Sequence, residues 1–139
     1  MVTENRQRIY DVLGNLKSAG AITASAAGGE VFDTGGGYTD GVMVTNISAC
    51  EVDTGDELYT IALQGTNTAA FGGADIVDIC MFQLGDATQL TGDEDLTTGV
   101  IITPFCNNFL GTLYRYLRVY CTIAGTIATG INYSCFLSK

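Results

Sequence analysis

The chain has no histidine among its 139 residues. Catalytic systems in which a histidine activates a serine or cysteine nucleophile are therefore excluded. A structural zinc site has few possible ligands, because the five cysteines are widely spaced and include no Cys-x-x-Cys pair. The glycine run 35–37 is not followed by a lysine, so it is not a phosphate-binding loop. We therefore expect a protein that is not an enzyme, with no catalytic residues, no metal site and no cofactor.

Long apolar segments are also missing, and there is a single proline, Pro104. No run approaches the roughly 20 residues of a membrane-spanning helix. The charged first residues lack the apolar stretch of a secretory signal peptide. Hydrophobic residues make up 47% of the chain, which supports a packed core and argues against disorder. We expect no membrane partner, and a protein made and used in a cytoplasm or in a particle assembled there.

Basic residues are few: six Lys and Arg stand against fifteen Asp and Glu, for a net charge of −9. In residues 1–17, three basic and two acidic side chains give +1. In residues 18–138, two arginines and thirteen acids give −11. A body this acidic repels phosphate backbones, so we expect no nucleic-acid partner.

The five cysteines are odd in number and far apart in sequence: Cys50, Cys80, Cys106, Cys121 and Cys135. Three of them, Cys80, Cys121 and Cys135, fall in strand patterns, where free cysteine behaves as a small core side chain. We do not expect a disulfide framework, but the sequence leaves the redox state of the thiols open.

Residues 3–17 carry the one helical pattern. Their apolar side chains at i, i+3, i+4 and i+7 form a single stripe. We expect a short helix there, within an N-terminal arm of residues 1–18. Two interpretations stay open: the stripe packs on its own domain, or it docks on a partner. The arm residues that would then form the interface are Arg6, Arg8, Ile9, Leu13, Leu16 and Lys17.

From residue 21 onward the period changes to two, and turn residues interrupt it. The predicted strands are 21–25, 30–34, 42–48, 57–64, 74–84, 100–103, 113–123 and 126–137, with a further short one at 88–90. The first two flank Gly28-Gly29 as a hairpin would, and Pro104 is expected to end the strand 100–103. Eight or nine strands at this spacing predict an all-β fold, most simply a jelly-roll β-sandwich of about eight strands over residues 19–139.

The clearest alternation runs from Leu113 to Ile123. Leu117, Val119 and Cys121 point to one side, which predicts a buried face in the middle of the sandwich. The opposite side has the composition of a protein interface, and its candidate residues are Tyr114, Tyr116, Arg118 and Tyr120. The alternative, that these tyrosines lie in a second layer or are only partly exposed, stays open.

The triplet Asp-Thr-Gly occurs twice, at 33–35 and at 53–55. Aspartic proteases use two such carboxylates that share one proton. Here Gly36 and Asp56 follow the triplets instead of Ser or Ala, and Asp-Thr-Gly is also an ordinary turn sequence. An aspartic protease is therefore kept only as a remote alternative.

An ordered series of segments resembles the capsid cement, or decoration, proteins of tailed bacteriophages. The series is Ala-Ile-Thr-Ala-Ser at 21–25, Val-Phe-Asp-Thr-Gly at 31–35, Gly-Asp-Glu-Leu-Tyr at 55–59 and Arg-Tyr-Leu-Arg-Val-Tyr at 115–120, followed by a closing strand. Within this family the chain is most similar to the jelly-roll cement protein of a Bordetella phage, over residues 19–139.

The resemblance implies a structural protein on the outer surface of a virion, made in the cytoplasm of the bacterial host. Such proteins bridge neighbouring major capsid proteins and stabilise the shell, often as homodimers or other homo-oligomers. An acidic body is compatible with a surface that faces away from packaged DNA. The alternative from another class is a carbohydrate- or receptor-binding β-sandwich of the head-fibre or adhesin type. We expect that deletion of residues 1–17 leaves a folded protein that no longer decorates capsids.

Overall fold

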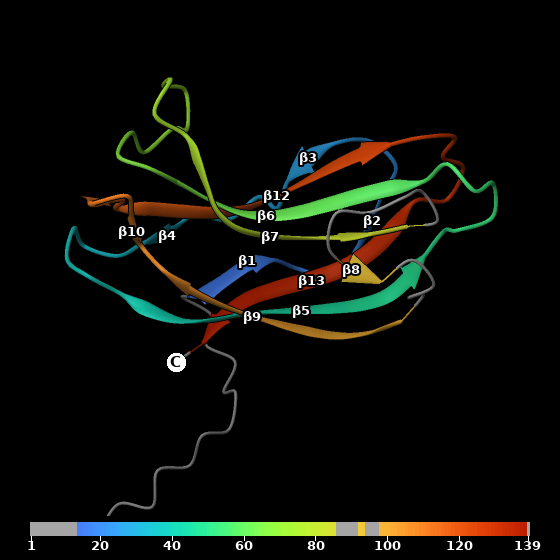
Figure 1. Cartoon of the computed structure of the whole chain (residues 1–139), viewed down its shortest axis with the longest axis horizontal. Helices are drawn as coiled ribbons and strands as arrows, with labels where there is room; N and C mark the ends of the chain where they lie inside the picture. The colour runs from blue at the N-terminus through green and yellow to red at the C-terminus, as the bar shows by residue number, and fades with distance from the viewer. Residues whose placement is uncertain (1–13, 86–91, 94–97, 139) are drawn as a thin grey trace, which may run out of the picture.

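Two antiparallel β-sheets pack face to face in the computed structural model, which describes residues 14–85, 92–93 and 98–138 (Figure 1). The first sheet has the order β1-β13-β5-β9, and β2 also pairs with β13. The second has the order β3-β12-β6-β7-β8, and β4 also pairs with β12. Among the described strands, only β7 and the short β8 pair in parallel. The prediction of an all-β sandwich is confirmed, since the described residues form strands and no α-helix.

The strands of the first sheet are β1 (Asn15–Lys17), β2 (Ala21–Ile22), β5 (Asp40–Cys50), β9 (Gly99–Cys106) and β13 (Ile131–Ser138). Those of the second are β3 (Ala26–Ala27), β4 (Phe32–Asp33), β6 (Leu58–Thr66), β7 (Val77–Leu84), β8 (Gly92–Asp93) and β12 (Tyr116–Ala124). A separate hairpin is formed by β10 (Asn108–Phe109) and β11 (Thr112–Leu113).

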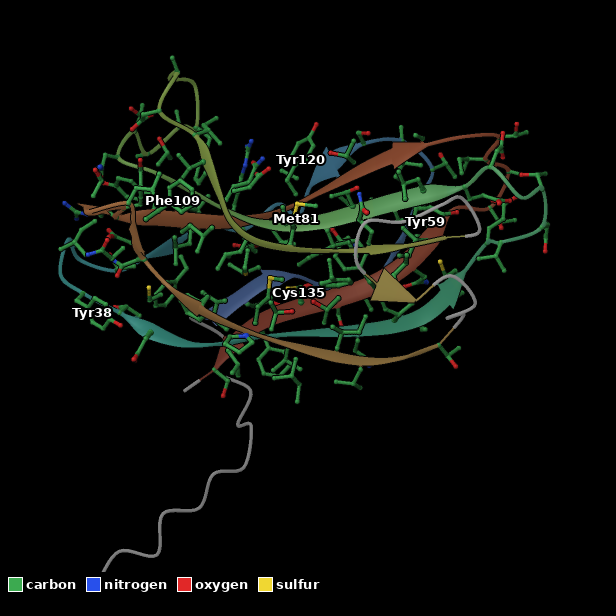
Figure 2. The ribbon with its side chains drawn as sticks, viewed as in Figure 1. Tyr38, Tyr59, Met81, Phe109, Tyr120 and Cys135 are labelled. Atoms are coloured by element: carbon green, nitrogen blue, oxygen red, sulfur yellow. The ribbon has the colours of Figure 1, made fainter. Side chains whose placement is uncertain are left out.

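The core lies between the sheets and is built by alternation along the long strands. Side chains of β6, β12 and β13 that point inward are fully buried, namely Tyr59, Ile61, Leu63, Leu117, Val119, Cys121, Ile131, Tyr133 and Cys135. Figure 2 shows Tyr59 and Cys135 between the two layers. The inward face predicted for the strand 113–123 is therefore confirmed at Leu117, Val119 and Cys121, and β6 and β13 alternate in the same way.

The helix predicted for residues 3–17 is wrong at its C-terminal end, where Asn15–Lys17 forms β1 and pairs with β13. Leu16 is fully buried in the core. Burial of this side chain stabilises the extended conformation in which the segment pairs with β13. Gly14 also lies so close to β13 that a Cβ there would stand 2.6 Å from the Leu137 carbonyl oxygen. Residues 3–13 lie outside the described residues. The first sheet thus includes residues that the sequence had assigned to the arm.

The hairpin predicted around Gly28-Gly29 does not form. The segment instead crosses from one sheet to the other, because β2 pairs with β13, whereas β3 and β4 pair with β12. Gly28 permits this crossing: its N–H donates to the Val119 carbonyl oxygen at 2.9 Å, and a Cβ would stand 2.3 Å from the Leu16 carbonyl oxygen. Close approach of two backbones therefore requires glycine at this position.

Pro104 does not end its strand, as the sequence predicted, but lies within β9 opposite Val42. Among the described residues, β9 pairs with β5 alone and forms an edge of the first sheet. An edge strand tolerates proline because the missing N–H can face away from the neighbouring strand. The strand predicted at 88–90 lies outside the described residues, and β8 follows it at residues 92–93.

Candidate functional site

Three of the predicted interface residues, Tyr116, Arg118 and Tyr120, lie on the outward face of β12. All three are partly exposed, whereas their inward neighbours Leu117 and Val119 are fully buried. Figure 2 shows Tyr120 on the side of β12 away from the other sheet. The structure therefore brings these three side chains together on one surface, as period-two alternation predicts.

Arg118 is fixed in place by contacts on three sides. Its Nε donates a hydrogen bond to Oε1 of Gln64, the residue directly opposite on β6, at 3.0 Å. The guanidinium carbon stands 4.3 Å from the ring centroid of Phe71 and 5.3 Å from that of Tyr120. Gln64 in turn donates to Oδ1 of Asp78 on β7 at 3.1 Å. The guanidinium thus contacts two aromatic rings, and such cation–π contacts are stabilising.

Phe71 comes from the segment between β6 and β7, which rises above β12 (Figure 1). Its φ is 52°, an unfavourable backbone conformation for a bulky residue, yet its side chain is only 8% exposed. The segment is anchored by Asp75, which accepts hydrogen bonds from Thr66 Oγ1 at 2.6 Å and from Asn67 N at 3.0 Å. These bonds lower the pKa of Asp75. The loop therefore holds Phe71 over Arg118 despite backbone strain.

Arg115, the residue immediately before β12, makes a different kind of contact. Its Nε and Nη2 donate to the two carboxylate oxygens of Asp33 at 2.8 and 3.1 Å. The hydrogen bond from Arg115 is the main cause that lowers the pKa of Asp33. Both side chains are about half exposed, at 47% and 48%, so the pair contributes little to stability. The guanidinium also lies 5.2 Å from the Tyr116 ring centroid.

Tyr114 does not join the outward face. The predicted strand 113–123 is interrupted at residues 114 and 115, and Tyr114 turns inward until it is 9% exposed. Asn107, which is fully buried, holds this turn: its carbonyl oxygen accepts from Tyr114 N at 2.9 Å, and its Nδ2 donates to the Tyr114 carbonyl oxygen at 3.1 Å. A buried amide therefore replaces strand pairing at this point.

Two of the arm candidates, Leu16 and Lys17, lie inside the sandwich rather than on its surface. Lys17 is 6% exposed, and its Nζ donates to the carbonyl oxygens of Gly20 and Tyr133, both at 2.8 Å, and of Ser18 at 3.1 Å. Burial lowers the pKa of Lys17. The other candidates, Arg6, Arg8, Ile9 and Leu13, lie outside the described residues. Because a cut after residue 17 would remove β1, a cut after residue 13 is the cleaner test of the arm.

The two Asp-Thr-Gly turns lie at opposite ends of β12. Asp33 stands opposite Tyr116, the first residue of the strand. The turn at 53–55 lies beyond the last residue, where Thr54 Oγ1 donates to the Thr126 carbonyl oxygen at 3.3 Å. A nine-residue strand is roughly 27 Å long, so Asp33 and Asp53 do not form a pair that shares a proton. Gly35 and Gly55 have φ values of 82° and 84°, as turn glycines do.

Other chemistry is sparse in the part of the chain that the structure describes. All five cysteines are free thiols, and no group of three or more His, Cys, Asp or Glu residues there is arranged to hold a metal ion. None of the described segments is a helix of sufficient length and apolarity to span a membrane.

Comparison of the chain with models of known protein families gives no match, and comparison with curated proteins gives none either. The candidate site is therefore defined by its own geometry: Tyr116, Arg118 and Tyr120, which the sequence predicted, together with Phe71 and Gln64, which it did not. Gln64 could have been suggested by the sequence, because alternation along the strand 57–64 places it on the outward face. A loop residue such as Phe71 gives no such signal, because its contact with Arg118 is made through the fold.

Proposed function

We propose that this chain is a capsid cement protein that binds the outer surface of a phage head and bridges neighbouring major capsid proteins. The observation that carries the proposal is the outward face of β12, where Arg118 contacts the rings of Phe71 and Tyr120 and Tyr116 is also partly exposed. Arginine and tyrosine that are held rigid by packing are typical of the residues that dominate protein–protein binding. The ordered resemblance to cement proteins supports a major capsid protein as the partner of this surface.

The order of the strands supports a jelly roll as the finer description of the fold. If β1 with β2 and β3 with β4 are each counted as one interrupted strand, the long strands number eight. In chain order the sheets then are 1-8-3-6 and 2-7-4-5, apart from the short β8 and the β10–β11 hairpin. This is the order expected when two Greek keys wrap into a double sheet. A jelly roll is also the architecture that the resemblance to cement proteins implies.

Charge supports a position on the outside of the shell. The body of the chain carries −11 over residues 18–138, which opposes contact with packaged DNA. Modest contacts repeated over many copies, or through homodimers that grip two subunits at once, would stabilise the capsid by avidity. The proposed location is therefore the outer surface of the virion, after synthesis in the bacterial cytoplasm.

The carbohydrate-binding alternative would use the same aromatic rings. In this structure Tyr116 and Tyr120 already contact guanidinium groups at 5.2 and 5.3 Å, and Phe71 is covered by Arg118. Rings that are engaged in this way have less free surface for a sugar to stack on. The geometry therefore favours a protein partner.

The test is to mix the purified chain with undecorated capsids of the phage that encodes it and, separately, with a panel of immobilised glycans. We expect saturable co-sedimentation with capsids and an increase in the temperature at which the capsids break. Binding to a glycan without binding to capsids would replace the cement proposal with the carbohydrate alternative.

A further inference from the structure

We propose that Arg118 is a preformed receptor for a single carboxylate, supplied by an Asp or Glu side chain on the capsid subunit. This inference rests on the proposed function of the outward face of β12 and adds the chemical group that the face recognises. A guanidinium presents paired N–H donors in a fixed fork that matches the two oxygens of a carboxylate.

The Arg118 side chain is already ordered before any partner arrives. Gln64 Oε1 accepts from Nε at 3.0 Å, and the guanidinium carbon lies 4.3 Å from the ring centroid of Phe71 and 5.3 Å from that of Tyr120. Among the described residues, no hydrogen bond occupies the two Nη atoms, which stay available to a partner. A long side chain fixed in this way loses little conformational entropy on binding, which is the main cost that a flexible arginine would bring.

Arg118 also lacks the acidic partner that such a fork normally has. Among the described residues no carboxylate lies within ion-pair distance of it; the nearest connection runs through Gln64 to Asp78, with no direct contact. Arg115 shows the contrast, because Asp33 occupies its fork with two hydrogen bonds. Among the described residues, Arg118 is thus an arginine that is held in place and has no carboxylate partner.

The surroundings favour one carboxylate over a polyanion. In the register of the sheet, Tyr120 stands opposite Ala62, and Ala62 opposite Met81, so that an apolar row borders the row of Arg118 and Gln64. An apolar border excludes water and strengthens a charge-assisted hydrogen bond within it. The acidic body opposes an extended polyanion such as nucleic acid. A single acidic side chain within an apolar protein surface would suit both the apolar row beside Arg118 and the negative charge of the body.

The first experiment uses the isolated chain and does not depend on the cement function. Protein labelled with ¹⁵N at arginine is titrated with sodium acetate at constant ionic strength, with sodium chloride as the reference. We expect side-chain N–H signals of Arg118 to shift selectively, whereas the Nε–H signal of Arg115 stays where it is. Equal shifts of both arginines, or none at Arg118, would overturn the proposal.

The second experiment measures affinity for undecorated capsids with Arg118→Gln, Arg118→Lys and the matched control Arg115→Gln, which removes the same charge nearby. We expect Arg118→Gln to weaken binding about 30-fold or more, as loss of a dominant interface residue does. Arg118→Lys should lose most of this affinity, because it keeps the charge but not the fork. Arg115→Gln should change binding at most about fivefold.

These outcomes separate the two proposals. If the unmodified chain does not bind capsids, the cement function fails and the acetate titration alone decides the role of Arg118. If the unmodified chain binds and Arg118→Gln binds equally well, the cement function stands and the carboxylate receptor is refuted. Binding by Arg118→Lys at full affinity would also refute it, since a point charge would then suffice. The midpoint of thermal unfolding of each variant verifies that the fold is intact.

Discussion

The two faces of β12 differ in what their side chains contact, although they alternate along one nine-residue strand. On the inward face, Leu117, Val119 and Cys121 have no exposed surface and belong to the hydrophobic core. On the outward face, Arg118 and Tyr120 stay partly exposed and contact a loop and each other. The inward face therefore determines stability. The contacts on the outward face hold Arg118 in position, as expected of a binding surface.

The largest expected effect is on the inward face. Leu117→Ala should lower the free energy of unfolding by roughly 2–5 kcal/mol, because a fully buried leucine leaves a cavity in a rigid core. Chemical denaturation followed by circular dichroism measures this loss. Thr122→Ala is the matched control on the same strand, since Thr122 is exposed and its removal should cost about 0.5 kcal/mol or less. Equal losses for the two variants would contradict the assignment of faces.

The next effect is a loss of stability at alkaline pH that originates from the inward face. Burial raises the pKa of Cys121 and of Cys135 to about 12, and that of Cys50 and Cys80 to about 11. Above about pH 9 these thiols ionise in the unfolded chain but keep their protons in the folded one. The folded state then binds more protons, so stability falls as pH rises toward 11 or 12.

One thiol accounts for about 1.4 kcal/mol of this loss between pH 8 and pH 10. Cys121→Ala should therefore lose about that much less than the unmodified chain over the same interval, measured by urea unfolding under reducing conditions. Lys17 acts in the opposite direction, because burial lowers its pKa and its contribution to stability rises with pH. A Cys121→Ala variant with an unchanged pH slope would show that this thiol is not buried in the folded protein.

The smallest effect on stability belongs to the outward face. Tyr120→Leu keeps an apolar side chain but removes the ring that Arg118 contacts, which should cost at most about 1 kcal/mol of unfolding free energy. The affinity for capsids should fall by a larger amount, because the guanidinium loses one of its two aromatic contacts. A variant that is strongly destabilised while its affinity is unchanged would reverse the roles assigned to the two faces.

The sequence predicts the long strands well because their alternation is a local property. The buried sides of β6, β12 and β13 follow directly from a period of two, and no knowledge of the neighbouring strand is needed. The same reasoning cannot find β1, whose three residues become a strand only because β13 lies beside them and Leu16 fits the core. Its apolar spacing, read alone, matched a helix equally well.

Other errors share this tertiary origin. The sequence placed Tyr114 with Tyr116 on one face, but the buried Asn107, seven residues earlier in the chain, holds Tyr114 out of the strand. The sequence also predicted that Pro104 ends a strand. Proline would interrupt a central strand, but β9 lies at an edge of the sheet and tolerates it. In the candidate site, the outward positions were predictable, whereas the Phe71 contact that fixes Arg118 depends on the path of a loop.

A cryo-EM map of capsids decorated with this protein tests the central claim most directly. The account predicts that the outward face of β12 lies against a capsid subunit, with density from an acidic side chain of that subunit at the guanidinium of Arg118. A map in which this face points into solvent, while another surface of the sandwich contacts the shell, would contradict it.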